Sequence, residues 1–290
     1  MIHPTLVAGP AFIALLLLEV WLSRRRGRPT HQMLDSMTSI TMGLGSAVIG
    51  LGAKAVQLVT YQWLYEFRIV EIGTGPWAWF GCMLSVDLAY YWFHRLHHEI
   101  RFLWAAHVTH HSSRHYNLAT ALRQTWSPFT SLIFYAPLAI LGFEPVMIMT
   151  AYAINLIYQF WIHTELIDRL GPFEWIFNTP SHHRVHHGTN LAYLDRNHAG
   201  TLIIWDRLFG SFEPEQEEVR YGLTRNIESH NPLYVAYHEW LAILRDVIRP
   251  GSWRNRFGYL WYAPGWSPNG STHTANERRE IERLRSASAG

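Results

Sequence analysis

Cysteine and charge are scarce in this 290-residue chain, and both absences exclude classes of protein. The single cysteine, Cys82, lies in an apolar run, so neither a disulfide framework nor a thiolate metal site can be built from it. Charged residues make up 16% of the chain, against roughly a quarter in soluble domains. The formal net charge is only +2, so we expect no nucleic-acid partner.

Long apolar runs are present instead. Residues 5–22, 37–65 and 76–93 each approach the ~20 residues that span a hydrocarbon core. Residues 128–162 are also apolar, with a Gly-Phe-Glu-Pro break at 142–145 that predicts a helical hairpin. The runs predict an all-α integral membrane bundle of about four membrane helices, the hairpin included. The alternative is the buried core of a soluble helical protein, which four such runs argue against.

The arginines that follow the first apolar run predict its orientation. Arg24, Arg25, Arg26 and Arg28 come after the run, whereas a secretory signal carries its positive charge before the apolar core. They place this end of the first helix on the cytoplasmic side. Counting the later crossings then brings the histidine-rich segments to the cytoplasmic side as well.

Histidine is the residue in excess. The chain has 18 histidines, and 13 of them fall between His94 and His198. They form three clusters, which read HRLHH at 94–98, HVTHH at 107–111 and HHRVHH at 182–187. On a helix, residues three and four apart lie on one face, so each cluster can direct two or three imidazoles at one ion.

This spacing predicts a metal site and its ligands. His163 is a further candidate, because it lies where the hairpin leaves the membrane and a polar group there needs a partner. So many imidazoles exceed the needs of one ion and suit two, while imidazole alone does not decide between iron, zinc, copper and nickel. The predicted ligands are His94, His98, His107, His110, His111, His163, His183, His186 and His187.

Four further residues are candidates for supporting the ligands. Asp87 lies inside an apolar run, where it is expected to accept a hydrogen bond from a ligand N–H or, alternatively, to cap a helix end. His97 and His182 are each one residue out of register with the ligand face, which favours a place beside the metals or at the surface. Asp206 is a candidate for orienting a histidine.

The chain resembles the fatty acid hydroxylase/sterol desaturase superfamily of integral-membrane oxygenases, and within it most closely the alkylglycerol monooxygenase branch. The resemblance covers about residues 35–240. It rests on the three histidine boxes and on the strings WAAHVTHHSS (104–113), YNLATALRQ (116–124), NTPSHHRVHHGTN (178–190) and TLIIWDRLFGSFE (201–213).

The resemblance implies a membrane base of four helices with a cytosolic helical cap that holds a di-metal site. It also implies two iron ions, with zinc as an alternative in the purified protein, and O2-dependent hydroxylation or desaturation of a lipid, sterol or alkylglycerol. No dinucleotide fingerprint is present, so electrons must come from an external donor, with a pterin or a separate protein as candidates. We expect a membrane segment at 1–34, a catalytic domain at 35–240 and a polar, aromatic tail at 241–290.

Three other functions compete with this interpretation. A bis-histidine haem or quinone electron-transfer protein places single histidines within membrane helices, whereas here they cluster beyond the helix ends. A metal transporter would place its ligands at the membrane midplane. A zinc hydrolase needs three ligands on one metal, which leaves most of these histidines unused.

Overall fold

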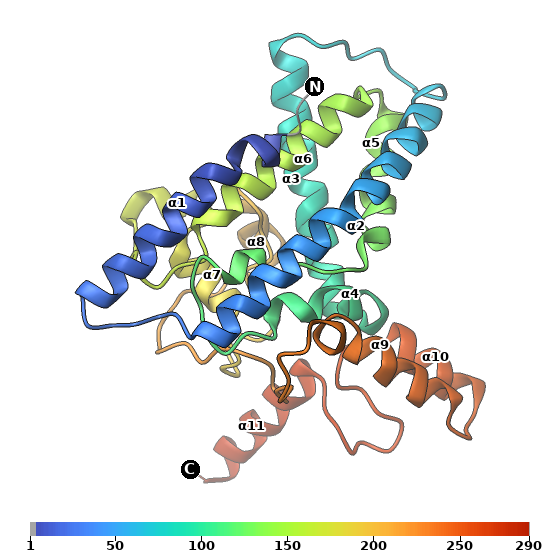
Figure 1. Cartoon of the computed structure of the whole chain (residues 1–290). Coiled ribbons are helices and arrows are strands. Elements are labelled where there is room, and N and C mark those ends of the chain that lie inside the picture. Colours follow the sequence, from blue (N-terminus) through green and yellow to red (C-terminus); the bar gives the residue numbers. More distant parts are fainter. Residues whose placement is uncertain (1–3, 290) are drawn as a thin grey trace.

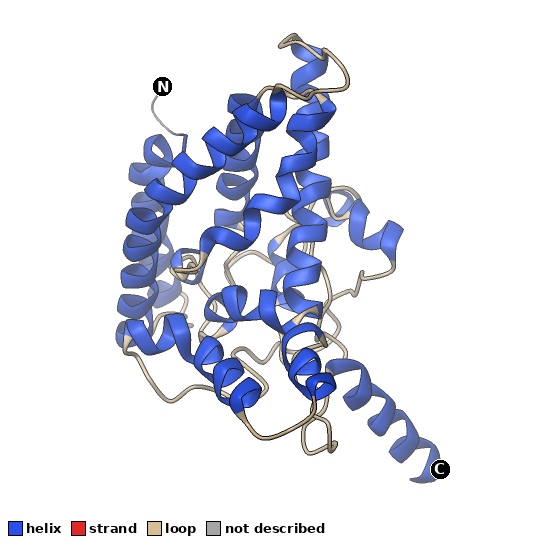
Figure 2. Cartoon of the chain, turned by 90° about the vertical axis from the view of Figure 1, so that its right-hand side faces the viewer, coloured by secondary structure: helices blue, strands red, loops and turns tan. Residues whose placement is uncertain are grey.

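The computed structural model describes residues 4–289, and no strand is present in that range (Figure 2). The predicted all-α fold class is therefore confirmed for this part of the chain. Three short 3-10 helices, η1 (Thr120–Leu122), η2 (Pro128–Ser131) and η3 (Gly171–Trp175), lie between the longer helices. The α-helices are α1 (Pro4–Arg25), α2 (Met33–Tyr65), α3 (Pro76–Glu99), α4 (Arg101–His111), α5 (Leu132–Leu141), α6 (Pro145–Trp161), α7 (Pro180–His186), α8 (Ile204–Phe209), α9 (Pro232–Ile248), α10 (Trp253–Trp261) and α11 (Ala275–Ala289).

Two of these helices are long and apolar enough to cross a membrane. They are Val7–Arg25 of α1, with a mean hydropathy of 1.6, and α2, with a mean hydropathy of 1.4. Only 11% of the most apolar stretch of each helix is buried, so their apolar side chains face outward rather than into a core. The two helices indicate a membrane protein, while the predicted total of four membrane helices stays a prediction.

The upper part of the molecule is a bundle of α2, α3, α5 and α6 (Figure 1). Its core contains side chains from all four helices, among them Tyr61, Cys82, Tyr135 and Met147. The predicted hairpin is present as α5 and α6, which are joined at Gly142. Gly142 has a φ of +121°, and a Cβ there would lie 1.9 Å from the Val70 carbonyl oxygen, so only glycine fits this turn.

The lower part contains α4, α7 and α8, with α9 and α10 packed against α4 and α11 extending away (Figure 1). α1 packs against α6, and one of its charged residues binds the segments that follow α4 and α6. Glu19 is buried, and it accepts hydrogen bonds from the Leu118 N–H at 2.7 Å and from the Thr164 hydroxyl. This explains why a carboxylate interrupts the first apolar run.

Candidate metal centre

The nine predicted ligands converge in two adjacent groups. The first contains histidines of α3, α4 and α7, and the second contains histidines of α4, α7 and the turn after α6. Within each group one nitrogen of every imidazole lies within 4.8 Å of the others. The first group consists of His94, His98, His107, His111 and His186, and the second of His110, His163, His183 and His187.

The helical spacing within each box decides which group a histidine joins. In α4, His107 and His111 are four residues apart and belong to the first group, while His110 points to the second. The third box is arranged conversely, with His183 and His187 in the second group and His186 in the first. Because consecutive helical residues point about 100° apart, one box can serve two metal positions.

The nitrogen–nitrogen distances fit metal coordination. In the first group, the Nε2 atom of His107 lies 2.9 Å from that of His94 and 3.1 Å from that of His111. In the second, the Nε2 atom of His163 lies 3.2 Å from that of His110 and 3.0 Å from that of His183. Two imidazoles bound to one ion at right angles, each near ~2.1 Å from it, would be separated by about 3.0 Å.

Hydrogen bonding on the far side of each ring shows that these nitrogens need a cation. The Nδ1 atoms of His163 and His110 face the carbonyl oxygens of Gln159, at 2.7 Å, and Arg123, at 3.3 Å. A carbonyl can only accept, so each Nδ1 carries the proton and each Nε2 of the neutral ring carries a lone pair. The two lone pairs face each other at 3.2 Å and repel unless a cation lies between them.

The same arrangement recurs in the first group. His94 donates through Nδ1 to the His198 carbonyl oxygen at 2.7 Å, and His186 donates to the Arg196 carbonyl oxygen at 2.9 Å. Nε2 of His98 is buried without a hydrogen-bond partner, while its Nδ1 lies 3.3 Å from a carboxylate oxygen of Asp195. These backbone and carboxylate acceptors fix the rings with their lone pairs directed inward, as metal-bound histidines require.

The electrostatics of the site also favour metal binding. Burial, reinforced by neighbouring imidazoles, lowers the pKa of His107, His111, His183 and His187 well below the usual histidine value. Burial lowers the pKa of His163 to about 4. All of these rings are therefore neutral near pH 7, which is the form that binds metals. Among residues 4–289 the ligand atoms of both groups are all nitrogen, which suits iron, zinc, copper or nickel.

The four supporting candidates lie outside the two groups. Asp87 accepts no hydrogen bond from a ligand histidine; its partners are the N–H groups of Thr201 at 2.8 Å and Leu202 at 3.1 Å, together with the side chains of Trp205 and Asn155. It thus holds α8 and the segment before it against α3.

Asp206 acts one step away from a ligand. Its carboxylate accepts hydrogen bonds from the N–H groups of His198 and Ala199, both at 2.8 Å, and from the Ser211 hydroxyl. His198 in turn supplies the carbonyl that orients His94. Burial outweighs these bonds and raises the pKa of Asp206 to about 6.

His97 and His182 are buried but point away from the metal positions. Nδ1 of His97 lies 2.6 Å from the Phe93 carbonyl oxygen, and its Nε2 lies 2.9 Å from the Thr130 hydroxyl. His182 packs edge-on against Phe212. The sequence placed both beside the metals or at the surface; their burial excludes the surface.

His198 is a residue that the spacing analysis missed. Its ring lies 5.1 Å from that of His98 and 5.7 Å from that of His186, and its Nδ1 is buried without a partner. It lies in a loop, outside the three histidine boxes, and this loop packs beside the first histidine group. The neighbouring residues Asp195 and Asn197 have positive φ angles of 54° and 55°, which shows that this loop is held in an uncommon conformation.

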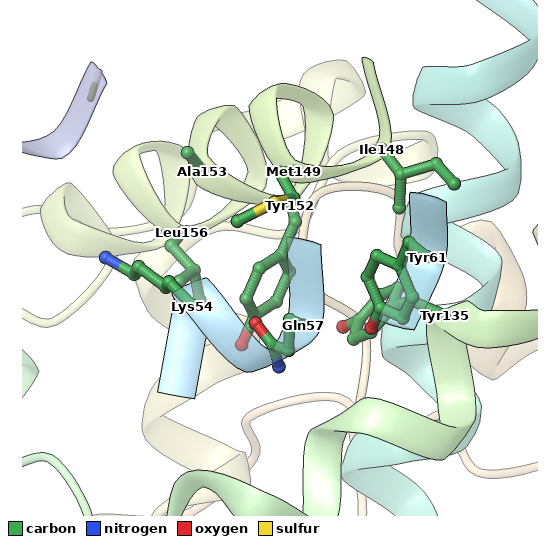
Figure 3. Close-up of a pocket in the computed structure, with 9 residues that line it drawn as sticks. All are labelled: Lys54, Gln57, Tyr61, Tyr135, Ile148, Met149, Tyr152, Ala153 and Leu156. Atoms are coloured by element: carbon green, nitrogen blue, oxygen red, sulfur yellow. The ribbon is translucent and has the colours of Figure 1, made fainter. Parts of the chain in front are cut away.

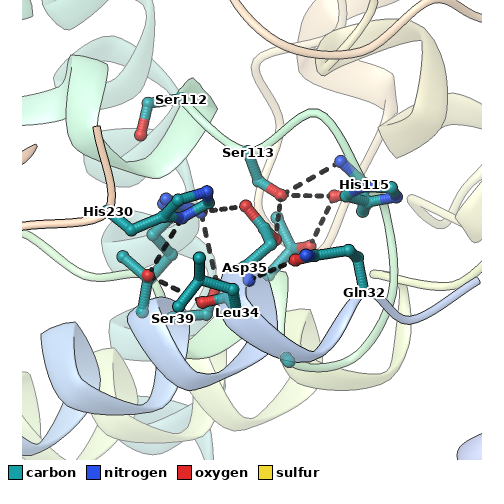
Figure 4. A network of polar contacts seen from close by, with 12 residues as sticks. Gln32, Leu34, Asp35, Ser39, Ser112, Ser113, His115 and His230 are labelled. Carbon is teal, nitrogen blue, oxygen red and sulfur yellow. Dashed lines mark hydrogen bonds and ion pairs between the residues drawn. The ribbon is translucent and has the colours of Figure 1, made fainter. Parts of the chain in front are cut away.

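One cavity adjoins the histidine groups and another lies within the helical bundle. The polar cavity of about 370 Å³ is lined by Asp35 and by Ser112, which directly follows the predicted ligand His111 (Figure 4). Arg123 also lines it and forms a buried ion pair with Asp35 at 2.7 Å. An apolar one between α2, α5 and α6 holds only about 30 Å³ and is lined by Lys54 and several tyrosines (Figure 3). The second has room for about one water, so a lipid chain would enter only if these helices separate.

Comparison with known proteins agrees with the geometry. The family model for fatty acid hydroxylases matches residues 79–211, which contain both histidine groups. Alkylglycerol monooxygenase of Homo sapiens is 46% identical over 265 residues, which cover 90% of this chain and 59% of that protein. This chain therefore spans well under two thirds of the length of that relative.

More distant relatives carry related names. An ornithine lipid hydroxylase of Rhizobium tropici is 29% identical over 170 residues, 57% of this chain and 48% of its own length. Cholesterol 25-hydroxylase of Homo sapiens is 29% identical over 143 residues, 45% of this chain and 49% of its own length. No solved structure matches the chain. The resemblance predicted from the histidine boxes is confirmed, and residues 79–211 of the chain match the fatty acid hydroxylase family.

Proposed function

We propose that this protein is a membrane-bound, O2-dependent lipid monooxygenase whose nine clustered histidines hold two iron ions. The observation that carries the proposal is the pair of histidine groups, whose buried lone pairs face one another at about 3 Å and fit two adjacent cations. The names of the relatives, a monooxygenase and two hydroxylases, support oxidation of a lipid as the reaction.

Iron and the protein are proposed to have separate roles. Bound iron would supply O2 activation and the attack on an unactivated C–H bond, while the protein orients the ions and keeps the site dry. His94, His163 and His186 are held by carbonyl groups, so their rings cannot turn away from the ions. The buried carboxylate of Asp206 is proposed to be a positioning residue that acts through the backbone of His198.

The membrane arrangement is part of the proposal. α1, α2, α3 and the α5–α6 hairpin are proposed to form the membrane base, with the histidines on the cytoplasmic side beneath it. Arg24 and Arg25 at the end of α1 support this orientation. The substrate, an alkylglycerol, sterol or other lipid, would reach the metals from the bilayer along the bundle.

An external donor is proposed to supply the electrons. The polar cavity supports this step, because it lies beside the metal ligands and is lined by both hydrogen-bond donors and acceptors (Figure 4). The carbonyl oxygen of Arg123, which lines the cavity, also accepts from the ligand His110. A water-soluble reductant such as a reduced pterin, or a separate electron-donor protein, could deliver electrons from this side.

The test is lipid oxidation by the iron-loaded protein in nanodiscs. Alkylglycerol, sterol and fatty acid substrates would each be supplied with ¹⁸O2 and either a reduced pterin or a reductase-driven donor protein. We expect one lipid class to be oxidised, and the product identifies the reaction. Hydroxylation adds a single ¹⁸O atom, desaturation removes two hydrogens without adding oxygen, and ether cleavage splits the lipid into an aldehyde and an alcohol. The His110→Ala variant should lose this activity, whereas His97→Ala, which removes a buried histidine outside both groups, should retain it.

Iron-loaded protein that oxidises none of these lipids with either donor would refute the proposed reaction. The electron-transfer alternative predicts bound haem with a visible absorption band instead. The geometry disfavours it, because ring nitrogens about 3 Å apart leave no room for a porphyrin between them.

A further inference from the structure

Helices α9 and α10 form a hairpin that lies outside the region matched by the family model. One side of α9 packs on the rest of the molecule through Val235, Ala236 and Ile243. On its other side Leu241, Leu244 and Ile248 are exposed and follow one another at intervals of three and four residues. This spacing places them in one apolar stripe along the helix.

The second helix of the hairpin repeats the pattern with aromatic residues. Trp253, Phe257 and Trp261 are four residues apart and are 80%, 54% and 47% exposed. Phe102 stacks on Trp261 and the Arg256 guanidinium lies over Trp253, but the large apolar residues of both stripes remain exposed. Large apolar side chains exposed in helical register on two neighbouring helices indicate a surface that is covered in the working protein.

The charged side chains of the hairpin are sorted by sign. Both acidic residues, Glu239 and Asp246, turn inward and bind Arg101 of α4, at 2.7 Å and 2.8 Å. Arg245 and Arg254 remain exposed at the surface. The hairpin therefore presents an outer surface that is apolar and positively charged, with its negative charges neutralised inside.

The hairpin also adjoins exposed apolar residues of the membrane helices. Its Trp240 ring lies 5.7 Å from that of Phe129. Phe129 is exposed, as is Ile133, which follows it by four residues in α5. α9 also contacts α2, whose first turns expose Met33 and Met37. In Figure 1 the hairpin lies below α4 and extends to the lower right of the molecule. Its apolar stripes therefore adjoin the outward-facing surface of the membrane helices.

We infer that the α9–α10 hairpin lies in the headgroup region of the membrane, with its apolar stripes in the outer acyl layer and its arginines against anionic lipid phosphates. Tryptophan and arginine on one surface are typical of helices that rest at this boundary, where aromatic rings sit half in water. A protein partner would explain the apolar stripes but not their continuity with the membrane helices. The inference rests on membrane attachment and is independent of the reaction.

The experiment measures the depth of single labels in the full chain. Cys82→Ala provides a cysteine-free background, and a nitroxide is placed on Leu244→Cys or Phe257→Cys. Ser286→Cys, on the exposed polar helix α11, is the matched control. Each protein is reconstituted into liposomes with and without anionic phosphatidylglycerol. Accessibility is then measured towards O2, which concentrates in the bilayer, and towards a water-soluble nickel chelate. Unchanged metal content shows that each variant is folded.

We expect the labels on the hairpin to be several-fold more accessible to O2 relative to the nickel chelate than the label on α11. Their depth should increase when phosphatidylglycerol is present, and replacing Arg245 and Arg254 by glutamine should remove that increase. Labels that behave like the α11 control would overturn the inference. Labels shielded from both reagents would also overturn it, because they would show burial against protein rather than lipid.

Discussion

Replacing His163 separates the two histidine groups experimentally. The His163→Ala variant removes one of four imidazoles from the second group and leaves all five ligands of the first group in place. We therefore expect purified His163→Ala to bind about half as much metal as the unmodified protein. His163 also matters because it lies outside the three sequence boxes, so its assignment rests on its place after the hairpin and on its position beside His110 and His183.

The size of the effect can be estimated from the ligand number. Four-ligand structural zinc sites bind with about 10–16 kcal/mol, so one ligand of four contributes roughly 3 kcal/mol. At 1.4 kcal/mol for each factor of ten, the second group should bind its metal roughly 100-fold more weakly. A chelator titration followed by elemental analysis would resolve this shift, because metal should then leave in two separate steps.

His97→Ala is the matched control. His97 is as deeply buried as His163, but its two ring nitrogens face the Phe93 carbonyl and the Thr130 hydroxyl rather than other histidines. Both variants lose a buried ring and should unfold at a lower temperature, while only His163→Ala should lose metal. Equal metal content in the two variants would refute the assignment of His163 as a ligand.

Three other perturbations follow from the structure. Asp206→Ala leaves the N–H groups of His198 and Ala199 buried without an acceptor, so the free energy of unfolding in urea should fall by about 3 kcal/mol. A decrease below half that value would contradict the role of Asp206 in anchoring this loop. Arg123→Met leaves the buried Asp35 charge unpaired and should cost about 3–5 kcal/mol, most of which the Arg123→Met/Asp35→Asn double variant should recover in the same unfolding assay. Burial lowers the pKa of the ligand histidines in the folded state below 6.5, so the unfolded chain takes up protons first as the pH falls. The free energy of unfolding and the amount of bound metal should therefore be highest above about pH 6.5 and decline below it. Thermal unfolding and elemental analysis between pH 7.5 and pH 5 measure both quantities. A flat profile would show that the rings are not buried and neutral.

The clustering of the histidines could be predicted from the sequence because helical spacing is local. Residues three and four apart share a face whatever the rest of the fold does, so three histidine boxes were sufficient to name eight of the nine histidines that converge. The division into two groups was not predicted. It depends on how α4 and α7 are rotated relative to each other, so that His110 and His111, which are neighbours in sequence, face different metal positions. Rotation of one helix about its axis is a property of tertiary packing.

The apolar runs predicted the helices for a similar reason, but they did not predict the partners of charged residues inside them. Glu19 and Asp87 both lie within apolar helices, and both accept hydrogen bonds from backbone N–H groups that are 99 to 115 residues away in sequence. The expectation that Asp87 would accept a hydrogen bond from a ligand histidine followed from its place inside an apolar run, where a carboxylate needs a partner. The structure shows that this buried carboxylate is satisfied instead by N–H groups of the segment before α8.

Backbone carbonyls, more than side chains, set the orientation of the ligand rings. His94, His110, His163 and His186 each lie with Nδ1 against a carbonyl oxygen, a group that every residue has and that no sequence pattern reveals. Substituting the residue that owns such a carbonyl would leave the hydrogen bond intact. The residues that matter are those that hold the carbonyl in place, and Asp206 is one of them, since it fixes the loop whose His198 oxygen faces His94. Positioning of the metal site should therefore be more sensitive to buried carboxylates such as Asp206 than to the identity of the loop side chains.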